Sequence, residues 1–103
     1  MSKPKRTINL SSALMDSSLV GRFDELAATI LVNESNPYIA KILQDRRSSE
    51  LAVVTAIVLA SWAVDNPKKS KSILGFSVVG CEFTQVLGRL LEKMVISKNR
   101  GAA

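Results

Sequence analysis

The feature of this sequence that most constrains its fold is its most apolar run, Leu51–Val64, which contains no charged residue. Its alanine content and its length of 14 residues favour a helix, although its β-branched residues would also suit a strand. A helix that is apolar on every side is typical of a segment that several neighbours contact. The run is shorter than the roughly 20 residues that a bilayer span needs. We therefore expect a central core helix at about 49–65, with Trp62 buried and no membrane partner.

The segments around this run predict the helices that would pack on it. Apolar residues recur at intervals of three and four over residues 16–34, and the same spacing predicts a long C-terminal helix at about 72–97. Asn36 and Pro37 provide an N-cap and a first turn for a short helix at 37–47. The sequence thus predicts an all-α fold, a compact bundle of four to five helices. The alternative left open is an α+β form in which residues 73–80 pair as a strand.

Length and patterning together predict a single domain. A chain of 103 residues has room for one core. We expect a basic N-terminal arm at 1–15, a helical domain at 16–98 and a flexible tail at 99–103. No secretory signal pattern opens the sequence, and a single cysteine suits a reducing compartment, so an intracellular, cytoplasmic location is expected.

The residue types in this chain exclude several chemistries. There is no histidine and only one cysteine, Cys81, which excludes His-based triads, zinc fingers and disulfide scaffolds. The carboxylates do not cluster, and the glycines match neither the dinucleotide fingerprint nor the P-loop. We therefore expect a non-enzymatic protein with no cofactor, no metal site and no small-molecule substrate.

The net charge of +5 is concentrated at the two ends of the chain. Clustered Lys and Arg residues are typical of proteins that bind a polyanion, although a solvated basic surface has the same composition. Two clusters directly precede an expected helix start, where free backbone amides favour an anion. The candidate phosphate-binding residues are Lys68, Lys69, Lys71, Arg46, Arg47, Lys3, Lys5 and Arg6.

A row of small residues is the second candidate site. Gly80, Thr84 and Gly88 follow one another at intervals of four, so on a helix they would form one ridge. Glycine destabilises a helix interior by about 0.5–1 kcal/mol, which suggests a packing reason for two of them. The ridge would lie either against the central helix or at a face for self-association or another partner.

These features predict a small basic subunit of a nucleoprotein assembly that contacts nucleic-acid phosphates without strong sequence preference. The alternative is a protein–protein adaptor or structural assembly subunit with no nucleic-acid role. Salt dependence distinguishes the two, because phosphate contacts weaken steeply as salt rises.

Overall fold

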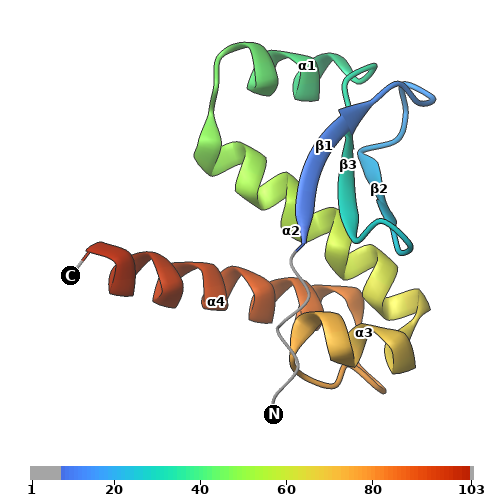
Figure 1. Ribbon diagram of the computed structural model, residues 1–103, viewed down its shortest axis with the longest axis vertical. Coiled ribbons are helices and arrows are strands. Elements are labelled where there is room, and N and C mark those ends of the chain that lie inside the picture. The colour runs from blue at the N-terminus through green and yellow to red at the C-terminus, as the bar shows by residue number, and fades with distance from the viewer. Residues whose placement is uncertain (1–7, 103) are drawn as a thin grey trace.

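The computed structural model describes the backbone of residues 8–102 and the side chains of residues 8–94. Over these residues the chain forms a three-stranded mixed sheet and four helices, and the all-α prediction is therefore wrong (Figure 1). The elements, in chain order, are β1 (Asn9–Ala13), β2 (Gly21–Asp24), β3 (Thr29–Asn33), α1 (Pro37–Gln44), α2 (Ser48–Asp65), α3 (Pro67–Leu74) and α4 (Phe83–Ala102).

The helix predicted at 16–34 is replaced by the β2–β3 hairpin. Phe23 and Ile30 are buried, and their spacing of seven fits a helical stripe as well as two facing strands. Leu19 and Leu26 would complete the helical stripe, yet they are 49% and 95% exposed. Strand β3 instead pairs with a strand on each side. Its side chains alternate between the two faces of the sheet, so a period of two describes which of them are buried.

The sheet has the order β1-β3-β2, with β1 parallel and β2 antiparallel to β3. Its buried face packs on α2 through Phe23 and Val32. Gly21 allows this approach, because a Cβ there would overlap the Leu31 carbonyl oxygen and lie 3.0 Å from the Val58 side chain. The segment 1–15, expected to be an arm, therefore contains a strand of the domain, while residues 1–7 lie outside the described part.

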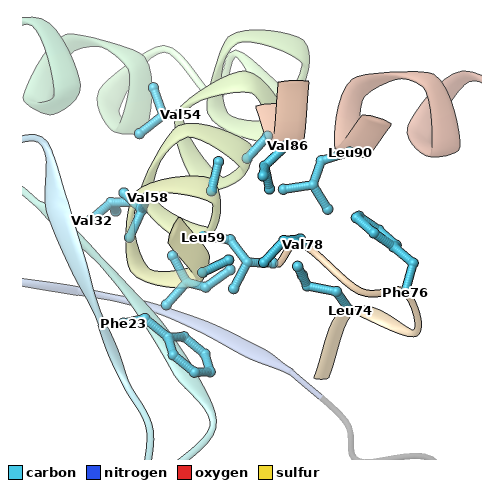
Figure 2. Packing of buried hydrophobic residues seen from close by; sticks show 14 of the residues in the cluster. Phe23, Val32, Val54, Val58, Leu59, Leu74, Phe76, Val78, Val86 and Leu90 are labelled. Atoms are coloured by element: carbon cyan, nitrogen blue, oxygen red, sulfur yellow. The ribbon is translucent and has the colours of Figure 1, made fainter. Parts of the chain in front are cut away.

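Helix α2 occupies the centre of the molecule, where a core helix was expected at 49–65. Figure 2 shows Val58 facing the sheet, while Val86 and Leu90 of α4 lie across the opposite side of α2. Trp62 is half-buried rather than buried, with its ring centroid 4.7 Å from that of Phe23.

By length and composition α2 could also cross a membrane, with 18 residues and a mean hydropathy of 1.4. Core helices of soluble proteins share these properties, and 33% of the α2 window is buried against the rest of the chain.

The long helix predicted at 72–97 is divided into two helices and a connection. Helix α3 ends at Gly75, whose φ of 83° suits glycine, and α4 begins only at Phe83. In the connection, Phe76 and Val78 are buried in the core. The alternative strand at 73–80 is therefore wrong as well. Helix α4 continues to Ala102, so most of the expected tail at 99–103 is helical.

Candidate nucleic-acid interface

The predicted phosphate-binding residues fall in three separate places. Lys3, Lys5 and Arg6 lie outside the described residues. Arg46 and Arg47 lie at the start of α2, whereas the three lysines at 68, 69 and 71 belong to α3, beyond its end. Because α2 has 18 residues, these two clusters are separated by about 27 Å along its axis. The structure does not bring them together into one site.

Of the two arginines at the start of α2, Arg47 is largely neutralised by acidic neighbours. The Arg47 guanidinium lies 3.4 Å from the Asp45 carboxylate and 3.8 Å from that of Glu50. Lys41 also pairs with Asp45, at 3.5 Å. Arg46 is exposed in the left-handed conformation, with a φ of 53°. Acidic neighbours thus reduce the attraction of this end of α2 for an anion.

The lysines of α3 differ in their surroundings. Lys69 forms an ion pair with Glu25, at 3.3 Å. Lys68 and Lys71 are exposed, and neither forms an ion pair within the part of the chain that the structure describes. They lie three residues apart and therefore project from one side of the helix. Asn66, at the N-cap position of α3, makes no side-chain capping hydrogen bond.

Helix α4 adds two cations that the sequence analysis did not select. The Arg89 guanidinium lies 4.1 Å from the centroid of the Phe76 ring, and the Lys93 ammonium lies 4.6 Å from it. The Lys93 ammonium also donates a hydrogen bond of 3.3 Å to the Leu74 carbonyl oxygen at the end of α3. These contacts hold both cations beside the C-terminal turn of α3.

We term the exposed cations of α3 and α4 that form no ion pair among the described residues the basic row: Lys68, Lys71, Arg89 and Lys93. Helices α3 and α4 come close together at Gly75, because a Cβ on this residue would lie 3.8 Å from the Lys93 ammonium. Gly75 comes one turn after Lys71, which itself comes one turn after Lys68. Lysine and arginine side chains in such a row can contact successive phosphate groups.

The small-residue ridge is not assembled by the structure. Gly80 lies in the turn before α4 with a φ of 76°, while Thr84 and Gly88 are exposed on α4. A Cβ at either glycine would have no neighbour within 4 Å. Over the described residues no second helix packs there, and a face for self-association or another partner at these residues stays a prediction.

The remaining polar features lie away from the basic row. A shallow hollow of about 300 Å³ lies beside β2, lined by residues 22–26 with charges of both signs. Hydrogen bonds from the Ser18 hydroxyl and then the Ser18 amide lower the pKa of the Asp16 carboxyl, in the β1–β2 connection. Among residues 8–94 no three His, Cys, Asp or Glu side chains are grouped as metal ligands.

Among the features described above, the basic row is the one that indicates a function. No protein-family model, curated protein or solved structure matches this chain.

Proposed function

We propose that this chain is a non-enzymatic nucleic-acid-binding subunit that contacts backbone phosphates through the basic row. The observation that supports this proposal is that Arg89 and Lys93 of α4 lie beside the end of α3, the helix that carries Lys68 and Lys71, and that none of the four is in an ion pair among the described residues. Residues 67–94 also carry an excess of positive charge. Such a surface attracts a polyanion and releases its counterions on binding.

The contacts beneath the row favour binding as well. Phe76 is 8% exposed and lies under Arg89 and Lys93, so both side chains are already ordered before a ligand arrives. An ordered side chain loses less conformational entropy when it binds a phosphate. Because the Phe76 ring is covered, it is not free to stack on a base. The proposal therefore includes weak sequence preference.

The test is a salt titration of the affinity for duplex and single-stranded probes, read by fluorescence anisotropy. The combined change Lys68→Gln and Lys71→Gln removes two phosphate contacts, so the slope of log affinity against log salt should become shallower by about 1.8 for duplex. The matched control, Arg46→Gln with Arg47→Gln, removes the same charge from the other end of α2. It should change the slope by about half as much, because Arg47 is already paired and only Arg46 is without an ion pair among the described residues.

Two results would overturn the proposal. One is the absence of measurable affinity for either probe at about 50 mM salt, where phosphate contacts are strongest. The other is an equal change of slope for the two double variants, which would show that only net charge matters. The first result would favour the adaptor alternative, for which the 95% exposure of Leu26 at the tip of the β2–β3 hairpin is the supporting observation.

A further inference from the structure

Strand β1 forms an open edge of the sheet. It pairs with β3 on one side, and no described segment pairs with its other side. Soluble proteins usually protect such an edge with a charge, a proline or a bulge. Residues 8–14 contain neither a charged residue nor a proline, and their register with β3 is unbroken. Leu10 is 48% exposed and Leu14 is 77% exposed.

The free backbone groups of this edge belong to alternate residues. The Asn9 amide donates to the Ala28 carbonyl oxygen at 2.9 Å, and the Ala13 carbonyl oxygen accepts from the Glu34 amide at 3.0 Å. The odd-numbered residues of β1 therefore direct their backbone groups at β3. Because the direction alternates along a strand, the N–H and C=O groups of Leu10 and Ser12 point away from the sheet.

We propose that two copies of this chain associate through antiparallel pairing of their β1 strands, with Ser11 at the twofold axis. In this register Leu10 of each copy exchanges two backbone hydrogen bonds with Ser12 of the other, and Ser11 lies opposite Ser11. The two three-stranded sheets would then form one six-stranded sheet. The interface is isologous, as in most homodimers.

The side chains of residues 8–14 are complementary to themselves in this register. Ile8 lies opposite Leu14 of the second copy, which covers the most exposed apolar side chain of the edge. No charged side chains are brought face to face, since residues 8–14 carry none. Any other partner would have to supply a neutral strand with an apolar residue opposite Leu14, whereas a second copy supplies both.

Helix α2 covers little of β1. Leu10 and Ser12 stand opposite Ile30 and Val32, whose side chains pack on α2. Helix α2 packs mainly against β2 and β3, so this face of β1 is largely uncovered. In Figure 1 the N-terminal part of α2 continues past β1 on the side away from β3. Part of α2 thus lies on the side where a further strand would be added.

The first test is the mass of the protein in solution, measured by sedimentation equilibrium over a wide range of concentration. The wild-type mass should rise from 11.2 kDa towards twice that value as concentration increases. Ser11→Lys and Ser11→Asp should each remain monomeric, because like charges would meet at the twofold axis. An equimolar mixture of the two variants should recover the dimer. The matched control, Ser17→Lys, places the same charge in the β1–β2 connection and should still dimerise.

A second test does not depend on how these charges affect folding. Opposed residues in this type of pair have Cα atoms about 4.5 Å apart, which a disulfide can bridge. With Cys81→Ser as background, Ser11→Cys should cross-link under mild oxidation, and Ser17→Cys should not. A wild-type protein that is monomeric at every concentration would overturn the proposal. A dimer that survives Ser11→Lys, or that fails to cross-link at Ser11→Cys, would assign the interface to another face and overturn it too.

Discussion

Asn33 is the residue whose side chain organises the largest part of the connection between β1 and β2. It is completely buried at the end of β3. Its Oδ1 accepts from the amides of Met15 and Ser35, at 3.1 and 2.9 Å. Its Nδ2 donates to the carbonyl oxygens of Asp16 and Leu19, at 2.7 and 2.8 Å. All four hydrogen bonds of this side chain are therefore to backbone groups, and the three to Met15, Asp16 and Leu19 fix the path of the connection.

Asn33→Ala should lower the free energy of unfolding by about 2–3 kcal/mol, because it leaves backbone donors and acceptors without partners in a partly buried region. Urea unfolding followed by circular dichroism measures the change. The control is Asn36→Ala, which removes the half-buried N-cap of α1 together with one hydrogen bond to the Ser17 carbonyl oxygen and should cost about 1 kcal/mol. Equal losses for the two variants would contradict the role assigned to Asn33.

Two glycines should respond in opposite directions to alanine. Gly21→Ala should destabilise the protein by about 1–3 kcal/mol, since the new Cβ would overlap the Leu31 carbonyl oxygen. Gly88→Ala should stabilise it by about 0.5–1 kcal/mol, because Gly88 lies in α4 with open space around it and alanine favours a helix. Thermal unfolding of both variants tests the pair. A destabilising Gly88→Ala would show that this position is in contact after all.

At the scale of the element, the helices that could be predicted are those with local signals. Asn36 caps α1 by accepting from the amides of Tyr38 and Ile39, and Pro37 begins the helix, as the sequence analysis expected. The apolar run that forms α2 has a length that favours a helix. Caps and continuous runs depend only on neighbouring residues, which explains why they can be recognised without the fold.

The sheet could not be predicted in the same way, because its pairing is not local. Leu19, Phe23, Leu26 and Ile30 fit a helical stripe, and only the exposure of Leu19 and Leu26 in the folded chain separates the two patterns. Strand β1 contains two serines and one half-exposed leucine, and it pairs with a strand about 20 residues later. A short polar strand of this kind has no periodic signal in the sequence.

Only half of the candidate site could be predicted from the sequence, for a similar reason. Lys68 and Lys71 belong to a run of basic residues that any composition scan detects. Arg89 and Lys93 join them only because the chain turns between α3 and α4, where Gly75 has a positive φ. The predicted continuous helix at 72–97 would have kept Phe76 away from both α4 cations, which are 13 and 17 positions later.

Phe76→Leu should show whether the ring contacts that hold Arg89 and Lys93 contribute to binding, because the change leaves their charge intact. Loss of the two ring contacts should lower the free energy of unfolding by about 1–2 kcal/mol. The affinity for duplex should fall several-fold, while the salt slope stays unchanged because no charge is lost. Phe83→Leu is the control, since no cation lies over that ring within the described residues. An unchanged affinity for Phe76→Leu would show that order in Arg89 and Lys93 contributes nothing.

Amide exchange should alternate along β1. In dilute protein the amides of Ser11 and Ala13 point at β3 and should exchange more slowly than those of Leu10 and Ser12. If two copies pair, the amides of Leu10 and Ser12 should slow as the protein is concentrated, whereas the pair facing β3 changes little. Nuclear magnetic resonance on labelled protein reads all four. Uniform exchange along the strand would contradict the assigned backbone directions.

At the scale of the whole molecule, the two proposed surfaces use different elements. The basic row belongs to α3 and α4, whereas the open edge belongs to β1. A twofold dimer would therefore carry two basic rows, and one nucleic-acid chain could contact both if it is long enough. Binding through two linked sites is tighter than binding through either one.

This combination predicts a dependence on probe length. A long duplex should bind the wild-type protein more tightly per site than a short one, and Ser11→Lys should lose this advantage while Ser17→Lys keeps it. Both variants carry the same added charge, so their comparison cancels the general effect of charge on affinity. Anisotropy with a short and a long probe measures the ratio. If the two variants depended on probe length to the same extent, dimerisation through β1 would not contribute to nucleic-acid binding.

The strand order also determines when the sheet can be completed during synthesis. Strand β1 leaves the ribosome first, but its only partner among the described elements is β3, which is made after β2. The β2–β3 hairpin closes a connection of only four residues and can therefore form early, whereas β1 must return across a longer loop. Until β3 has emerged, β1 is an unpaired neutral segment, and during this interval the nascent chain is exposed to misassociation through it.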